Sequence, residues 1–454
     1  MSSHRTRWWP VAAAALGLVA LAAWEHAEFS AGASRAAGDA VRGALACGAL
    51  FGACGYALAR LCVPPELRPH GPLLAFPLGA AVSAIALAAL GLLHVPFGVS
   101  LALVLAAGAA SGIAVRLRLG PWRDAGAGLL RPAYVAAVVA VVALSPVWRT
   151  GFSTVVGQNG DVVLAVGSAQ LVKEAPPTAI RPEMPIDRIP LVWRSKYPIF
   201  YSLAAVSELS GLSVVATFPL VAAALLAMAS FGFFLFARYA LRAPPWAALA
   251  VMAAVGLGRL PLHIADHPFY NELWALFALP FILTAGAAFL RAPSRGALAL
   301  LAVFGAIGTF AYPLMLPFPI LFLAVWGWRE RARLRPFLRR PDGPAWVWVP
   351  AAVAALAVLA VLVRGVVEKA ASAAVALSPW GDLSAWSGPG LLHLPFHRAF
   401  GLVDPGGDHQ RGQHPHRLEV EELGLGAVVG LADVVRRRHA HTARNRIGKG
   451  SISG

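Results

Sequence analysis

The sequence predicts an all-α protein that crosses a lipid bilayer about eleven times. Of its 454 residues, 58% are hydrophobic and only 13% are charged, whereas a soluble domain carries about 25% charged residues. The apolar residues also form long runs without a charged side chain, such as residues 98–115 and 346–363. A bilayer core needs about 20 apolar residues per helix. Because backbone polar groups in lipid must be satisfied within the segment, such runs are predicted to be helices.

A hydropathy window of about 19 residues places the predicted spans along the chain. They are residues 8–24, 41–63, 73–93, 98–115, 130–148, 213–237, 244–259, 273–290, 297–311, 314–328 and 345–364. The first span has an alternative interpretation as a signal peptide, because small residues at 30–33 offer a cleavage site. The length of its apolar run favours a signal anchor instead.

The distribution of arginine and lysine predicts the orientation. A cytoplasmic N-terminus places most basic residues in cytoplasmic segments, as the positive-inside rule requires. These residues are Arg5, Arg7, Arg68, Arg116, Arg118, Arg123, Arg238, Arg242, Arg291, Arg295, Arg329, Arg331, Arg333, Arg335, Arg339 and Arg340. The sequence therefore predicts a multi-pass protein of the cell membrane. The same rule accounts for the net charge of +16 without a nucleic-acid partner, since no basic surface domain is visible.

The predicted spans divide the chain into five parts. They are N-terminal transmembrane helices at 1–148, a large extracytoplasmic loop at 149–198, core transmembrane helices at 199–364, an extracytoplasmic segment at 365–407 and an atypical tail at 408–454. The composition changes abruptly at the start of the tail, which becomes rich in histidine and arginine. We expect the tail to be poorly ordered, as a truncated or out-of-frame end of a longer membrane protein.

The large outer loop carries the first group of candidate site residues. Asp161 has two interpretations: the N-cap of a helix over residues 162–172 lying at the membrane interface, or a catalytic base. Arg194 and Lys196 either extend their charges to the headgroups from a helix end or bind the phosphate of a lipid substrate. Asp187 is a secondary acidic candidate in the same loop.

A shorter outer segment, HIADHPFYNELW, carries the second group. His263, Asp266, His267 and Glu272 are close enough in sequence to suggest ligands of a divalent metal. The alternative is a hydrated loop packed on its neighbours, because Pro268 would interrupt any helix that held all four. Whether a metal is needed stays open at this point.

Three cysteines lie in one apolar segment at positions 47, 54 and 62, and we expect them to act as small packing residues rather than as disulfides. Gly48 and Gly52 form a GxxxG pair in the same segment. Such a pair predicts the close approach of a second helix.

Two stretches of sequence suggest a family. The outer loop leads into YPIFYSLAAVSELSGLS, and a second Tyr-Pro pair occurs in GTFAYPLMLPFPILF. Together with the acidic residue in the first large outer loop, this layout resembles the GT-C class of integral-membrane glycosyltransferases, over roughly residues 130–405. In many members a His occupies the position of Ala165.

The resemblance implies a function and roles for the loop residues. A polyprenyl-phosphate-linked sugar would be the donor, and a cell-envelope glycan or lipid would be the acceptor at the outer membrane face. By position, Asp161 would activate the acceptor hydroxyl. Arg194 and Lys196 would stabilise the phosphate that leaves.

Two other classes of function compete with this one. A transporter or flippase of a lipid-linked substrate would place polar groups near the bilayer midplane, often on broken helices. A membrane scaffold without catalytic activity is the third alternative. The predicted spans carry few ionisable residues at their centres, and the polar residues gather in the outer loops, which favours chemistry at the interface.

Overall fold

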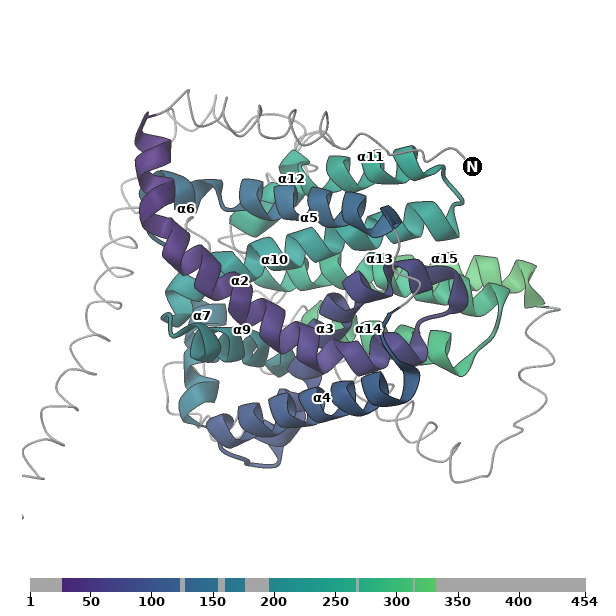
Figure 1. The fold of residues 1–454 in the computed structure, drawn as a ribbon, viewed down its shortest axis with the longest axis horizontal. Helices are drawn as coiled ribbons and strands as arrows, with labels where there is room; N and C mark the ends of the chain where they lie inside the picture. The colour runs from purple at the N-terminus through teal and green to yellow at the C-terminus, as the bar shows by residue number, and fades with distance from the viewer. Residues whose placement is uncertain are drawn as a thin grey trace, which may run out of the picture. The chain divides into compact units, whose positions relative to one another are not determined.

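A computed structural model describes residues 27–122, 127–153, 160–175, 196–266, 269–312 and 315–331. Within these ranges every regular element is a helix (Figure 1). The elements are α2 (Ala27–Cys62), η1 (Pro65–His70), α3 (Gly71–Leu92), α4 (Phe97–Leu119), η2 (Ala127–Leu129), α5 (Leu130–Ala143), α6 (Ser145–Thr150), α7 (Gly160–Glu174), α9 (Tyr197–Ser210), α10 (Val214–Leu235), the π-helix η5 (Phe236–Ala240), α11 (Pro245–Gly256), α12 (Arg259–Asp266), α13 (Tyr270–Arg291), α14 (Arg295–Ala311) and α15 (Pro317–Arg329).

Five of the described helical segments are long and apolar enough to cross a membrane. They are Gly32–Cys62, Pro65–Leu92, Phe97–Leu119, Val214–Ala240 and Tyr270–Arg291. Each covers most or all of a predicted span, at 41–63, 73–93, 98–115, 213–237 and 273–290. Counting α11 and α12 as one span bent by 43° adds a sixth. The apolar helices thus support a membrane protein, as the sequence predicts.

The other predicted spans have different outcomes. The helices α5, α11, α14 and α15 have 14, 12, 17 and 13 residues, fewer than the roughly 20 that a bilayer core needs. The predicted spans at 8–24 and 345–364 lie outside the described residues, as does the tail at 408–454.

Proline accounts for two of these short helices. The predicted span at 130–148 is divided at Leu144, and Pro146 occupies the first turn of α6. The predicted span at 244–259 ends at Gly256, and Pro261 lies in the first turn of α12. Proline has no backbone N–H and cannot continue the hydrogen bonds of a preceding helix. The chain therefore starts a new helix at each point.

The closest helix packing joins α2 and α3, but through glycines other than those predicted. A Cβ atom on Gly55 would lie 1.7 Å from the Ala75 carbonyl oxygen, and one on Gly79 would lie 1.7 Å from the Phe51 carbonyl oxygen. A Cβ on Gly48 would meet nothing within 4 Å. The prediction is therefore wrong for Gly48. Gly52 lies beside the contact, where a Cβ would be 3.6 Å from the Phe76 ring, but the closest approach is at Phe51 and Gly55.

The cysteines behave as predicted. Cys47 and Cys54 are buried in α2, Cys62 is half-buried at its end, and all three are free thiols. The Cys54 thiol lies 3.8 Å from the Val104 carbonyl oxygen of α4. The prediction that these residues serve in packing is confirmed for this helix.

The C-terminal ends of α2 and α4 meet at an arginine. The Arg60 guanidinium donates to the carbonyls of Leu119 and Gly120, at 3.1 and 3.2 Å, and lies 4.9 Å from the centre of the Trp122 ring. The last carbonyls of a helix have no partner within it. Arg60 therefore satisfies the end of a neighbouring helix.

A second arginine repeats this arrangement at the end of α13. The Arg291 guanidinium donates to the carbonyls of Tyr239 and Ala240 at the end of η5, which continues α10, and lies 4.9 Å from the centre of the Trp326 ring. Gly296 at the start of α14 packs against the Cys62 carbonyl at the end of α2, which joins the two groups.

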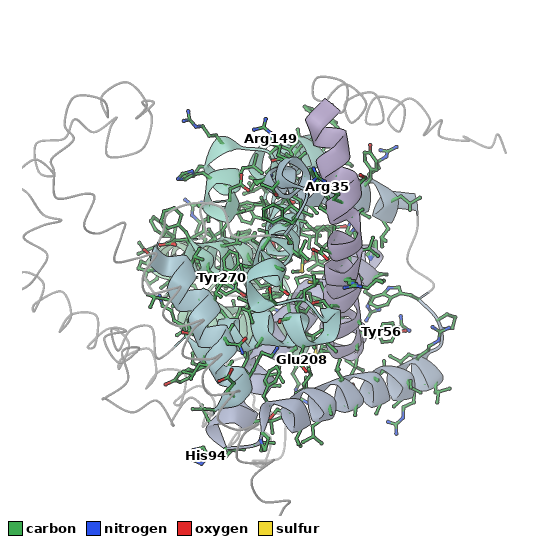
Figure 2. All side chains as sticks on the ribbon, turned by 90° about the vertical axis from the view of Figure 1, so that its left-hand side faces the viewer. Arg35, Tyr56, His94, Arg149, Glu208 and Tyr270 are labelled. Carbon is green, nitrogen blue, oxygen red and sulfur yellow. The ribbon has the colours of Figure 1, made fainter. Side chains whose placement is uncertain are left out.

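These contacts place the described arginines of the predicted cytoplasmic segments at one end of the helices, which we call the basic end. Its members are Arg68, Arg116, Arg118, Arg238, Arg242, Arg291, Arg295, Arg329 and Arg331, together with Arg60 at the end of α2 and Arg131 at the start of α5. Arg35 and Arg149 lie elsewhere: Gly151, which follows the end of α6, packs against the Arg35 side chain. Figure 2 shows Arg35 and Arg149 close together at one edge of the helices.

Candidate functional site

The helix predicted after the turn at Gly160 is present as α7. It begins at Gly160, so Asp161 lies in its first turn rather than at the N-cap position that the sequence predicts. Such a shift of one residue is within the usual uncertainty of helix boundaries. A carboxylate in the first turn is stabilised by the positive end of the helix dipole. The Asp161 side chain lies outside the described residues.

The helix α7 packs against neighbouring helices of the bundle. Val162, Ala165, Ala169 and Val172 are all buried, and their spacing of three or four residues places them on one face. This face packs against α9, with further contacts to α4, α10 and α13. Ala165 is fully buried, so the position at which many GT-C proteins carry His has no exposed surface here.

An ion pair joins α7 to α9. The Lys173 ammonium lies 2.8 Å from a carboxylate oxygen of Glu208, which joins the C-terminal turn of one helix to the C-terminal turn of the other. The helix α7 also contacts α13. The helix that carries Asp161 therefore packs against α9, which follows Lys196, and against α13, which contains Glu272.

The starts of α9 and α13 meet directly, and we call this place the α9–α13 junction. The Tyr270 hydroxyl donates to the Ile199 carbonyl at 3.0 Å, although the two residues are 71 positions apart in sequence. Tyr270 is fully buried, and Figure 2 shows it among the helices rather than at their edge. This hydrogen bond joins the start of α13 to the start of α9.

Lys196 is the described candidate of the outer loop that reaches this junction. It immediately precedes α9, whose first turn contains Pro198, and only 3% of Lys196 is exposed. Removing an ammonium group from water is costly unless its charge is compensated. Burial at the junction thus distinguishes Lys196 from a lysine that extends to the membrane surface. Asp187 and Arg194 lie outside the described residues.

The junction also contains Asn271, a polar residue of the segment HIADHPFYNELW to which the sequence assigns no role. Asn271 is 2% exposed, and its side-chain carbonyl oxygen accepts no hydrogen bond from the described residues. Buried polar atoms are usually satisfied, so an exception calls for an explanation such as a ligand or water. The signal in the sequence is weak, since Asn271 lies in an ordinary polar turn before an apolar helix.

The second group of candidates is helical rather than a loop. His263 and Asp266 belong to α12, and Glu272 lies in the first turn of α13. His263 is exposed with its ring 6.0 Å from that of Phe269, while Asp266 and Glu272 are half-buried. The predicted loop is wrong for these three residues, because α12 extends to Asp266 and α13 begins at Tyr270.

No group of three His, Cys, Asp or Glu side chains within metal-binding reach is found in the described part of the chain. His267 lies outside it. The divalent metal therefore stays a prediction that rests on the sequence alone.

Comparison of the chain with protein families, with curated proteins and with solved structures finds no match. The fold and the α9–α13 junction are therefore the features from which a function can be inferred. They define an all-helical protein of apolar, membrane-spanning segments, with buried polar residues where α9 and α13 begin.

Proposed function

We propose that this protein is a membrane glycosyltransferase of the GT-C type. It transfers a sugar from a polyprenyl-phosphate donor to a cell-envelope glycan or lipid. One observation carries the proposal: Lys196 and Asn271 are buried where α9 and α13 begin, whereas the centres of the five described spans carry no charged side chain. Ionisable groups within a membrane mark transport pathways, so their absence from these span centres supports chemistry at the interface.

The hydroxyl groups within the spans support the same conclusion. Ser83, Ser230 and Thr284 are buried, and each donates to a carbonyl of its own helix, at 3.4, 2.8 and 2.7 Å. A hydroxyl satisfied in this way needs no ligand. These three residues therefore do not form a polar site at the centre of the bilayer.

The proposed reaction uses the side chains of Asp161, Arg194 and Lys196. As the acceptor oxygen bonds to the anomeric carbon, the Asp161 carboxylate takes the hydroxyl proton. The bond from that carbon to the donor phosphate breaks, and the phosphate leaves as an anion. The Lys196 ammonium and the Arg194 guanidinium stabilise the negative charge that develops. The polyprenyl tail stays in the bilayer throughout.

Sugar transfer by the purified full-length protein in proteoliposomes tests the proposal. The vesicles contain a radiolabelled polyprenyl-phosphate sugar and are supplied with a mixture of cell-envelope glycans and lipids. We expect label to appear in an acceptor only when both substrates and the protein are present. Absence of transfer with every donor and acceptor, from protein that is folded, would leave the scaffold as the better interpretation.

A specific observation favours a transporter or flippase as the second candidate. The helices α11 and α12 are bent by 43° at a short break, and α12 carries His263 and Asp266. Broken helices commonly form substrate sites in transporters. In the same vesicles, movement of an intact fluorescent lipid-linked sugar across the bilayer, without transfer of the sugar, would support this candidate over the enzyme.

The proposal also assigns the orientation, with the basic end in the cytoplasm. A reporter inserted between Arg329 and Arg340 should then report a cytoplasmic position, and a tag near Pro177 should be accessible from outside. Access to both from the same side of the membrane would contradict the topology.

A further inference from the structure

An apolar cavity of about 370 Å³ lies between α2, α3, α5 and α10. Its lining includes Cys47 and Gly48 from α2, Phe76 from α3, Ala137 from α5, and Ala227 and Met228 from α10. This volume is within the range of about 300–1,000 Å³ that is typical of ligand sites. The lining carries no charged, hydroxyl or amide side chain, so the part of a ligand that enters the cavity must be hydrocarbon.

Small side chains create this space. The lining contains Gly48 on α2 and Ala137 on α5. A Cβ on Gly48 would meet no atom within 4 Å. A void without partner atoms forfeits the dispersion energy of its lining. Within a bilayer the lipid chains around the protein are available to fill it.

The cavity reaches the basic end, where charged groups flank it. Leu73 lines it and lies two residues after the start of α3, and Arg68 belongs to η1, which leads into that helix. Ala136 lines it from α5, and Arg131 lies five residues earlier in the first turn. Five helical residues span about 7.5 Å, which is within the reach of an arginine side chain and a headgroup.

These two arginines lie at one corner of the bundle. The helical turns η1 and η2, which precede α3 and α5, are in contact. Trp122 packs against Gly71, and its indole N–H donates to the Arg68 carbonyl at 3.2 Å. Arg68 and Arg131 are both exposed. Tryptophan favours the headgroup layer of a bilayer, so this corner is where the phosphate of a lipid would lie.

We propose that the cavity is a binding site for one anionic glycerophospholipid. One acyl chain occupies the space between α2, α3, α5 and α10, and the headgroup phosphate lies between Arg68 and Arg131. Basic pockets between membrane helices are suited to such headgroups. The site is at the basic end, remote from the α9–α13 junction, and so does not depend on the proposed function.

Photo-crosslinking tests this proposal on the full-length protein in vesicles. The probes are phosphatidylglycerol and phosphatidylcholine, each with a diazirine in one acyl chain, and crosslinked peptides are mapped by mass spectrometry. We expect phosphatidylglycerol to label the segments at 136–140 and 224–231 several-fold more than phosphatidylcholine. Equal labelling by the two probes would overturn the anionic site, and labelling confined to other segments would overturn the location.

Two sets of variants separate the chain from the headgroup. Ala137→Phe fills the cavity and should abolish labelling by both probes. The double substitution Arg68→Gln and Arg131→Gln should remove only the preference for phosphatidylglycerol. The matched control, Arg116→Gln with Arg118→Gln, removes two exposed charges of the basic end on α4 and should change neither result.

Two outcomes remain to be distinguished. If Ala137→Phe does not fold, Gly48→Leu fills the same space from α2, and unchanged labelling in that variant would refute the site. If a chemical crosslinker added without lipid probe instead joins lining residues to residues 8–24 of the same chain, the occupant is an internal segment and the proposal fails.

Discussion

At the basic end, Arg60 and Arg291 lie on tryptophan rings and donate to the last carbonyls of neighbouring helices. At the α9–α13 junction, Lys196 and Asn271 are almost fully buried at the starts of two helices. The arginines thus satisfy groups that the helices leave open, whereas an Asn271 oxygen has no partner among the described residues. The larger number of charges at the basic end therefore does not by itself indicate a functional site.

The difference has an energetic basis. A guanidinium at a helix C-terminus gains from both hydrogen bonds and the helix dipole, so these arginines stabilise the fold without any ligand. A buried polar oxygen without a partner costs free energy of folding. Such a cost is common at sites where a ligand completes the hydrogen bonds. We therefore expect substitutions at the basic end to change stability and substitutions near the junction to change activity.

Asp161→Asn should have the largest effect. Asparagine keeps the shape of the side chain and caps helices about as well as aspartate, but it cannot accept the acceptor proton. Loss of a general base typically lowers the rate by about 10²–10⁴-fold. The measurement is sugar transfer in proteoliposomes at equal protein content.

The matched control is Glu174→Gln at the other end of α7, where the exposed carboxylate accepts a hydrogen bond from Gln170 at 2.8 Å. This variant should retain full activity. Full activity in Asp161→Asn would remove that residue from the mechanism and make Asp187, Asp266 and Glu272 the candidates for the base.

Arg291→Ala should have the next largest effect, on stability. It removes two hydrogen bonds to the end of η5 and the contact with Trp326. Hydrogen bonds that involve a charged group contribute about 1.5–3 kcal/mol, so the free energy of unfolding should fall by about that amount. Thermal unfolding in detergent measures the change. Arg295→Ala, an exposed position four residues away, is the control and should unfold as the wild type does.

Tyr270→Phe tests the junction itself. It removes the hydrogen bond to the Ile199 carbonyl and keeps the buried ring, which packs on Phe218 and Trp274. The expected loss of stability is about 1 kcal/mol. Because the bond aligns the starts of α9 and α13, activity per folded molecule should also fall. A loss of stability with unchanged activity would place the junction with the basic end, as a purely structural feature.

The ion pair between Lys173 and Glu208 should have the smallest effect. The two side chains are 21% and 51% exposed, and solvent screens pairs of this kind, which contribute about 0.2–1 kcal/mol. A double-mutant cycle with Lys173→Met and Glu208→Gln measures the coupling. Coupling well above this range would show that the contact between α7 and α9 is better shielded from water than its exposure indicates.

Some residues of the candidate site could be predicted from the sequence, and others could not. The sequence indicated Lys196 as a basic residue at the end of the large outer loop and Glu272 as a member of a polar outer segment, and it predicted a helix after Asp161. It did not distinguish Asn271 or Tyr270, since neither residue type is unusual next to an apolar helix. It placed His263 and Asp266 in an outer loop, whereas both lie in the helix α12.

The sequence by itself determined where the described membrane helices lie, because transfer of a segment into lipid depends mainly on its own length and hydropathy. The predicted span at 73–93 and the helix α3, Gly71–Leu92, nearly coincide for this reason. Only the tertiary structure decided which residues meet. It selected Gly55 and Gly79 for the close helix contact and joined Tyr270 to Ile199, because such contacts depend on how the faces of distant helices pack together, and local hydropathy carries no information about that.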